Sequence, residues 1–190
     1  MSRDGGELQR AAFEAEALPH LDHLYNAAAY LCGDRERAGD LVQETFLRAY
    51  RFFHRFEPGT NCRAWLLTIL HNTFRNLYRA GQKERGKVDI DDPVAAREAS
   101  EATGGGEDPE ATVLSQMLDQ EVAQALAELP EEFRTAIVLV DMNELTYEES
   151  AKALECPVGT VRSRLSRGRR LLERKLAAYA AERGLGRRER

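Results

Sequence analysis

Apolar residues recur at helical spacing through the first half of the chain. In three segments they return every three or four residues, which is the pattern of a helix with one buried face. These residues are, in chain order, Leu21, Leu24, Ala28 and Leu31, then Ala38, Leu41, Val42, Thr45, Phe46 and Ala49, then Trp65, Leu66, Ile69, Leu70, Thr73, Phe74 and Leu77. Gly33-Asp34 and Pro58-Gly59 separate the segments, because glycine and proline end helices. The pattern predicts three helices around one core.

The second half has the same kind of periodicity. Its apolar stripes consist of Val113, Met117, Val122, Leu126 and Leu129, then Phe133, Ile137, Val138 and Val140. Pro130 separates the two stripes. No segment alternates apolar and polar residues for long enough to indicate a strand. The predicted fold class is therefore all-α, with two small helical domains.

The segment between these halves has a different composition. Residues 88–111 contain two prolines, three consecutive glycines and few large apolar residues. Such a segment cannot bury enough apolar surface to offset the entropy lost on ordering. We therefore expect a flexible acidic linker at 88–111 between domains 1–87 and 112–183, with a basic tail at 184–190. A length of 190 residues is sufficient for two domains of this size.

The net charge of −5 conceals three blocks of opposite sign. Residues 63–87 have a net charge of +5, residues 89–110 of −7, and residues 158–190 of +8. Basic blocks of this density are typical of surfaces that bind polyanions. The acidic total therefore does not exclude a nucleic-acid-binding protein.

Residues 145–165 have the pattern of a helix-turn-helix. Thr146 followed by Glu149 is a capping box that begins one helix, and Pro157 suits the first turn of a second helix near Val158. In a helix-turn-helix the second helix enters the major groove, where arginine bonds guanine and serine or threonine bonds phosphates or base edges. The residues expected on its front and flanks are Thr160, Arg162, Ser163, Arg164, Ser166 and Arg167.

Two sets of motifs resemble the extracytoplasmic-function (ECF) sigma factors of the sigma-70 family. The run Pro157-Val-Gly-Thr-Val-Arg-Ser-Arg-Leu, preceded by Leu129-Pro-Glu-Glu-Phe-Arg, is similar to their region 4. The runs Asp40-Leu-Val-Gln-Glu-Thr-Phe, Ala64-Trp-Leu and Asn72-Thr-Phe-Arg-Asn are similar to their region 2. The resemblance implies a protein that binds core RNA polymerase and recognises the −10 and −35 elements of promoter DNA.

The resemblance also implies partners and roles for individual residues. Asp40, Gln43 and Glu44 match the motif that binds the β′ coiled coil of the polymerase, and region 4 would meet the β flap. The acidic linker would thread through the polymerase toward the RNA channel. An anti-sigma factor is expected to hold the protein inactive as part of a stress response.

The −10 element is expected to contact one helix of the first half. The residues that match the family there are Trp65, Asn72, Arg75, Asn76 and Arg79. Arginines at these positions would hold strand phosphates, and the asparagines would line the pocket of a base lifted from the stack. Trp65 is either a stacking wedge or a core residue, because it also belongs to the apolar stripe of its helix.

Two other classes of protein share parts of this pattern. A stand-alone helix-turn-helix regulator would use the same second domain, but it would bind DNA without polymerase. An enzyme could use His20, His23 and Cys32 as metal ligands, but a structural zinc site needs four well-spaced ligands. We therefore expect no catalytic residues, no metal and no cofactor.

The remaining sequence features concern the compartment. The three cysteines, Cys32, Cys62 and Cys156, are odd in number and widely spaced, and the N-terminal residues lack the apolar run of a signal peptide. No stretch approaches the length of about 20 apolar residues that crosses a bilayer. We expect a cytoplasmic protein, associated with the nucleoid when bound to polymerase and without membrane insertion.

Overall fold

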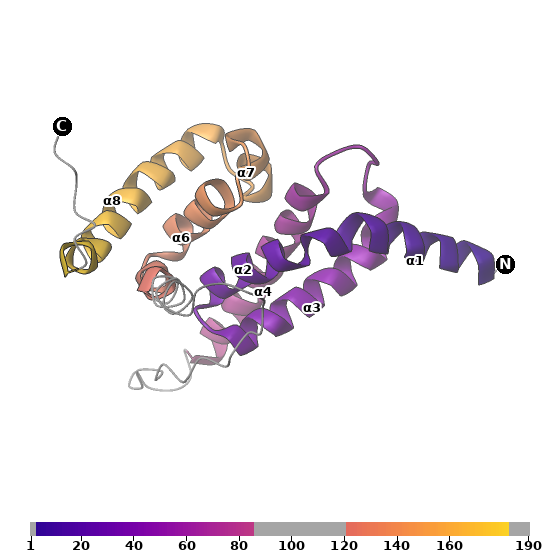
Figure 1. Ribbon diagram of the computed structural model, residues 1–190, viewed down its shortest axis with the longest axis horizontal. Helices are drawn as coiled ribbons and strands as arrows, with labels where there is room; N and C mark the ends of the chain where they lie inside the picture. The colour runs from indigo at the N-terminus through magenta and orange to yellow at the C-terminus, as the bar shows by residue number, and fades with distance from the viewer. Residues whose placement is uncertain (1–2, 86–120, 183–190) are drawn as a thin grey trace, which may run out of the picture.

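The computed structural model describes the backbone of residues 3–85 and 121–182. Every regular element within these two ranges is helical, which confirms the predicted all-α fold. Figure 1 shows the helices of the first range in indigo to magenta and those of the second range in orange to yellow. The expected linker 88–111 and basic tail 184–190 lie outside the described residues.

The first described range contains one more α-helix than the apolar pattern predicts. Its elements are α1 (Arg3–Ala17), the short turn η1 (Leu18–His20), α2 (Leu21–Cys32), α3 (Arg35–Phe52), the turn η2 (Phe53–Arg55) and α4 (Cys62–Arg85). The additional helix is α1, which extends away from the other helices at the right of Figure 1.

The predicted break at Gly33-Asp34 is confirmed. Gly33 closes α2 in the left-handed conformation, with φ of 67°, and its N–H donates to the Ala29 carbonyl at 2.8 Å. The Asp34 carboxylate accepts a hydrogen bond from the Arg37 N–H at 2.9 Å and so caps α3. A Cβ at Gly33 would also lie 3.1 Å from the Cβ of Ala127. Gly33 therefore allows both the left-handed turn and the close approach of Ala127 from the second half.

The helices α2, α3 and α4 bury a common core. Its largest fully buried side chains include Leu24, Leu31, Leu41, Leu66 and Leu70. Phe13 attaches α1 to this core, because its ring meets those of Phe46, Tyr50 and Phe53 edge to face at centroid distances of 6.2, 5.3 and 5.3 Å. One aromatic residue thus fixes a helix whose only large apolar side chains are Leu8 and Phe13.

The second described range begins with helical residues 121–127 and continues through four elements. These are α6 (Glu131–Ile137), a turn of π-helix η3 (Val138–Met142), α7 (Tyr147–Ala153) and α8 (Val158–Glu182). The helix predicted up to Leu129 is confirmed for its described part, and Val113 and Met117 lie outside the described residues.

The predicted helix-turn-helix is formed by α7 and α8. At the start of α7, the Thr146 hydroxyl accepts a hydrogen bond from the Glu149 N–H at 3.1 Å, and the Glu149 carboxylate accepts one from the Thr146 N–H at 2.9 Å. The capping box is therefore present. Glu155 turns the chain with φ of 50°, and the Pro157 carbonyl accepts from the Thr160 N–H at 2.8 Å as α8 begins.

Gly168 sets the distance between α8 and α6. A Cβ at this position would lie 3.0 Å from Ile137 Cδ1 and 3.2 Å from Phe133 Cβ, so the two helices meet where α8 has no side chain. Val161 and Leu165 of the same helix are buried, and α8 packs on α6. The orientation of the helix-turn-helix therefore depends on one glycine.

The two halves of the chain pack against each other. α7 lies on α4, while η3 and α6 lie on α2, so the orange helices α6 and α7 adjoin the purple ones (Figure 1). Arg134 of α6 is 8% exposed and donates from Nη1 to the Leu31 carbonyl at 2.7 Å. That carbonyl belongs to the last turn of α2, where helical partners are missing. A buried arginine therefore satisfies the end of a helix in the other half.

Replacement of Gly168 by leucine is expected to lower the free energy of unfolding by about 2 kcal/mol, because the new side chain enters a packed contact. Urea unfolding measures the change. Gly39→Ala is the matched control, since a Cβ at Gly39 in α3 meets nothing within 4 Å. The control is expected to be neutral or stabilising by up to about 1 kcal/mol. Equal stability of Gly168→Leu and the unsubstituted protein would contradict the role of Gly168.

Candidate nucleic-acid interface

The front of α8 presents an arc of polar and basic side chains. Its members are Thr160, Arg162, Ser163, Ser166 and Arg167. All are exposed except Thr160, which is half-buried. The guanidinium carbon of Arg162 lies 5.5 Å from the centroid of the Tyr147 ring, so an aromatic face of α7 supports this arginine. The structure therefore brings five of the six residues predicted on α8 together on one open face.

Arg164 lies apart from that face. It is half-buried, its Nη2 lies 3.4 Å from a carboxylate oxygen of Glu132, and its Nη1 donates to the Cys156 sulfur at 3.8 Å. Helical geometry explains the difference, because position 164 lies beside the buried stripe formed by Val161 and Leu165. Its side chain points toward the first half of the protein instead of toward the front of α8.

The residues predicted on α4 fall into different environments. Asn76 is exposed, while Asn72 is half-buried with its Oδ1 buried and without a hydrogen-bond partner among the described residues. Arg75 Nη2 donates to Glu155 Oε2 at 3.0 Å. The side chain of Arg79 lies outside the described residues. Of the predicted residues, Arg75 therefore contacts the second half.

Trp65 belongs to an aromatic cluster at the start of α4. Its ring lies 5.2 Å from that of Phe56 and 6.3 Å from that of Phe53, and it is half-buried. These contacts favour the core role among the two that the sequence left open. The exposed part of the ring still adjoins the loop before α4.

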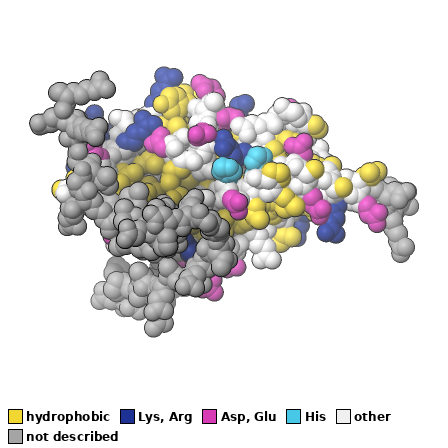
Figure 2. Space-filling view, in the orientation of Figure 1, with side chains coloured by type: hydrophobic (Ala, Val, Ile, Leu, Met, Phe, Trp, Pro, Cys, Tyr) yellow, Lys and Arg dark blue, Asp and Glu magenta, His cyan; other side chains and the backbone are white. Residues whose placement is uncertain are grey.

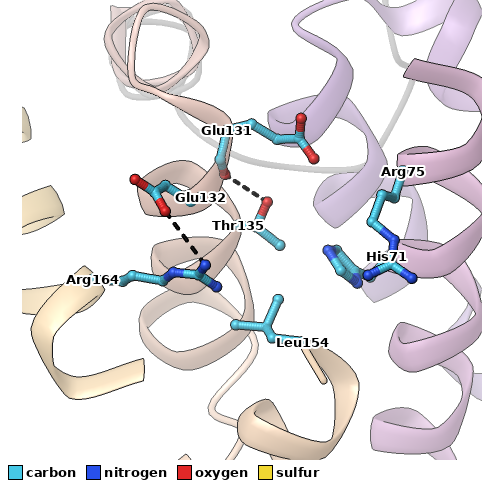
Figure 3. A pocket seen from close by; sticks show the side chains of 7 residues that line it. All are labelled: His71, Arg75, Glu131, Glu132, Thr135, Leu154 and Arg164. Atoms are coloured by element: carbon cyan, nitrogen blue, oxygen red, sulfur yellow. Dashed lines mark hydrogen bonds and ion pairs between the residues drawn. The ribbon is translucent and has the colours of Figure 1, made fainter. Parts of the chain in front are cut away.

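A polar pocket of about 380 Å³ lies where α4, α6 and α8 converge. Figure 3 shows His71 and Arg75 entering it from α4 and Arg164 from α8. The other lining residues are Glu131, Glu132, Thr135 and Leu154. The pocket contains both signs of charge, so the arginines that line it are balanced by nearby carboxylates.

His71 is a buried histidine at the contact between the halves. Its Nδ1 lies 3.2 Å from the Ala153 carbonyl, and because a carbonyl only accepts, this nitrogen is the one that bears the hydrogen. Burial lowers the pKa of His71 to about 4, with a further lowering by the charges of Arg75 and Arg164. The imidazole is therefore neutral near pH 7.

The three residues predicted to bind polymerase lie on the outer side of α3. Asp40 and Gln43 are exposed, and Glu44 is half-buried. The Glu44 carboxylate accepts a hydrogen bond from Arg48 Nε at 2.6 Å. The structure thus places all three away from the buried stripe, with one carboxylate already paired along its own helix.

An apolar groove that the sequence did not predict adjoins this surface. It has a volume of about 630 Å³ between α1 and α3, and Gln43 is one of its lining residues. Large apolar side chains remain partly exposed at its margin, namely Leu18, Leu21, Leu47 and Tyr50. Figure 2 shows apolar atoms at the surface over the part of the molecule where α1 and α3 run. The signal was missed because α1 itself was not predicted.

His20, His23 and Cys32, the candidate metal ligands of an enzyme, belong to the described side chains. No group of three or more His, Cys, Asp or Glu residues there has the geometry to hold a metal ion, so His20, His23 and Cys32 form no such cluster. Burial raises the pKa of the Cys32 and Cys62 thiols to about 11, which suppresses their thiolate forms.

No helix in the described part of the chain is long and apolar enough to cross a membrane.

Comparison with known proteins decides the family. Residues 18–84 match sigma-70 region 2, and residues 119–172 match sigma-70 region 4. The ECF RNA polymerase sigma factor EcfG of Rhodopseudomonas palustris is 39% identical over 155 residues, which are 82% of this chain and 80% of that protein. This chain belongs to the ECF sigma factors. The family resemblance read from the sequence is therefore confirmed, over the alternative of a stand-alone regulator.

Other relatives of this sigma factor match over different shares of their length. The sigma-H factor of Pseudomonas aeruginosa is 33% identical over 178 residues, which are 91% of this chain and 90% of that protein. The ECF sigma factor SigE of Mycolicibacterium smegmatis is 36% identical over 163 residues, which are 86% of this chain. The chain spans 61% of the length of that SigE protein.

Solved structures share the fold of this sigma factor. The sigma factor RpoE of Bartonella quintana, crystallised with the anti-sigma factor NepR, has a TM-score of 0.70 at 32% identity and matches 87% of this chain and 97% of that one. CnrH, crystallised with the cytosolic domain of CnrY, has a TM-score of 0.62 at 27% identity, over 89% of this chain and 90% of that one. The region 2 match begins at residue 18, so α1 lies outside it.

The stability of this sigma factor is expected to fall by about 2 kcal/mol between pH 7 and pH 5 through His71 alone. The native pKa of about 4 lies below the value of 6.5 for an exposed imidazole, so the unfolded chain takes up the proton first as the pH falls. Urea unfolding at both pH values measures the loss. In His71→Gln this part of the pH dependence should disappear, and an unchanged pH dependence in that variant would contradict the assignment.

Proposed function

We propose that this ECF sigma factor uses three separate surfaces to bring core RNA polymerase to a promoter. Domain 1–87 binds the polymerase through α3 and the −10 element through α4, and domain 112–183 binds the −35 element through α8. Residues 88–111 connect the two, and residues 184–190 form a basic tail. The observation that supports this division best is a complete helix-turn-helix whose second helix, α8, has an open polar and basic front.

The front of α8 has the chemistry needed to read a duplex. Arg162 stands near the N-terminal end of the helix, supported by the Tyr147 ring, and is proposed to bond guanine in a major groove. Ser163, Ser166 and Thr160 supply hydroxyls for phosphates or base edges, and Arg167 adds a positive charge on the same arc. Arg164 contributes from the inner flank once its contact with Glu132 is released.

The α4 surface is proposed to hold the opened −10 strand. Asn72 and Asn76 lie four residues apart on one helix face. The Oδ1 of Asn72 is buried and without a hydrogen-bond partner among the described residues, and it is proposed to bind a base once the strand exposes it. Arg75 and Arg79 are proposed to bind the phosphates of the strand. Trp65 supports the surface from the aromatic cluster beneath the loop before α4.

The outer side of α3 is proposed to bind the β′ coiled coil. Asp40 and Glu44 supply negative charge, and Gln43 joins this surface to the apolar groove beside α1. A polar row next to an apolar groove is typical of surfaces that receive a helix. The β flap is the proposed partner of the second domain.

The remaining assignments follow from the family. RpoE of Bartonella quintana, which has a similar fold, was crystallised with the anti-sigma factor NepR, and this supports an anti-sigma factor as the inhibitory partner of this chain and a stress signal as its release. The protein is proposed to have no catalytic chemistry and no cofactor of its own, because the polymerase performs the reaction. It is proposed to act in the cytoplasm, at the nucleoid when bound to polymerase.

Run-off transcription with purified core polymerase and a promoter library tests the proposal. The full chain is expected to direct initiation from a subset of sequences that share two elements, while core polymerase alone selects none. Failure of the chain to direct initiation from any promoter would overturn the proposed function.

Arg162→Ala is expected to weaken discrimination at one position of the −35 element by about 1–3 kcal/mol, which is the contribution of one good base contact. Run-off transcription from the selected promoter and its single-base variants measures the change. Arg174→Ala, an exposed arginine three turns further along α8, controls for the loss of one positive charge. Unchanged discrimination in Arg162→Ala would reject the base contact.

Glu44→Lys is expected to reduce affinity for core polymerase at least tenfold, because it reverses a charge on the proposed binding surface. Fluorescence anisotropy of the labelled chain with core polymerase measures the affinity, and circular dichroism monitors the helix content. Glu173→Lys makes the same change in net charge on an exposed position of α8 and should bind core polymerase normally. Equal affinities of the two variants would contradict the assignment to α3.

A further inference from the structure

Acidic residues of the helix-turn-helix contact the polar face of α4 directly. The Glu155 carboxylate accepts a hydrogen bond from Arg75 Nη2 at 3.0 Å, just after α7 ends. The Glu149 carboxylate, in the first turn of α7, accepts one from Asn61 Nδ2 at 2.8 Å. Asn61 in turn begins α4, because its side-chain oxygen accepts from the Ala64 N–H at 3.1 Å. Both ends of α7 are therefore joined to α4 through carboxylates.

A third carboxylate contacts the same face from the turn before α7. Glu144 lies 3.9 Å from Arg63 Nη2, the longest of the three contacts. Glu144 and Glu155 both have left-handed backbone conformations, with φ of 56° and 50°. Together these three residues form an acidic triplet, consisting of Glu144, Glu149 and Glu155. The triplet spans the length of α7 and presents its charges to one helix.

The triplet contacts one of the side chains assigned above to the −10 strand, Arg75. Arg75 is bonded to Glu155, and Asn72 is half-buried beside it. His71, between them and the second half, is 5% exposed and bonded to the Ala153 carbonyl. In contrast, the front of α8 remains open in the same structure. The packing of the halves thus affects one DNA-binding surface and leaves the other free.

We propose that the acidic triplet occupies the strand-binding face of α4 in the free sigma factor, so that the −10 strand binds only when the two halves separate. One carboxylate precedes α7, one lies in its first turn and one follows its end. They contact Arg75 and its neighbours where the phosphates of the strand would bind. The inference rests on the proposed function, because the DNA-binding role of Asn72 and Arg75 belongs to it.

The strength of the contacts suits a reversible closure. Every ion pair of the triplet is partly exposed, since the glutamate side chains of Glu155 and Glu144 retain 61% and 82% of their accessible surface. Such pairs contribute little individually and are screened by salt. When only a fraction of the molecules is open, the apparent affinity for the strand is the affinity of the open state multiplied by that fraction. A competing strand with many phosphates can therefore displace the closed state.

Small-angle X-ray scattering of the full chain tests the closure without DNA. Glu155→Arg places two like charges at the Arg75 contact, and it is expected to increase the radius of gyration. The exchanged pair Arg75→Glu with Glu155→Arg restores opposite charges and is expected to return the radius to that of the unsubstituted protein. An unchanged radius in Glu155→Arg would overturn the closure, as would a double variant that stays expanded.

Binding of the strand tests what the closure covers. The probe is a fluorescent oligonucleotide that carries the non-template −10 strand of a promoter selected in the run-off experiment. Glu155→Gln is expected to bind it about two- to fivefold more tightly than the unsubstituted chain, as the loss of one partly exposed pair allows. Glu148→Gln, an exposed residue of α7 with the same change in charge, is the matched control and should leave the affinity unchanged.

The outcomes separate this inference from the proposed function. If transcription is directed normally but Glu155→Gln binds the strand no better than Glu148→Gln, the coverage of α4 is wrong and the proposed function stands. If Glu155→Gln fails to bind the strand at all, the coverage is also wrong. If the chain directs no transcription, the strand-binding role falls with the proposed function, and scattering still reports whether the triplet closes the halves.

Discussion

The carboxylate of Glu149 binds the residues that begin two helices of this sigma factor, α7 and α4. It accepts hydrogen bonds from the N–H and the hydroxyl of Thr146, which start α7, and from Asn61, which starts α4. Burial opposes its ionisation, but these hydrogen bonds outweigh burial and lower the pKa of Glu149. The ionised group also lies near two helix N-termini, where a negative charge is favourable. The local start of the helix-turn-helix and its attachment to the first half are therefore one interaction.

Local signals predicted most of the helices because each has a local cause. Gly33 and Asp34 end one helix and begin the next through contacts within four residues, and the capping box at Thr146 acts over three. The helix α1 was not predicted, since its position depends on Phe13 meeting aromatic rings from α3 and η2. Periodicity detects a continuous apolar stripe, and a single aromatic anchor does not produce one.

In the candidate sites, too, features with a local cause were predicted and features that depend on tertiary contacts were not. The front of α8 was predicted because helical spacing alone places its residues on one arc. The ion pair of Arg164 with Glu132 was not, because it joins two helices, and the burial of His71 depends on the packing of α7 against α4. Contacts between residues about 80 positions apart, such as that of Arg75 with Glu155, leave no periodic trace in the sequence. Which surfaces are open is thus a property of the tertiary structure.

The two glutamates beside α7 that have left-handed backbone conformations combine backbone strain with side-chain ion pairs. A residue with a Cβ is strained at φ near 50°, and glycine would relieve that strain at either Glu144 or Glu155. Glycine would also remove the carboxylate that meets Arg63 or Arg75. The second half, which contains both glutamates, could therefore become more stable by the same exchange that weakens its contact with the first half. In this chain, selecting for thermal tolerance and selecting for a compact resting form would pull these two positions in opposite directions.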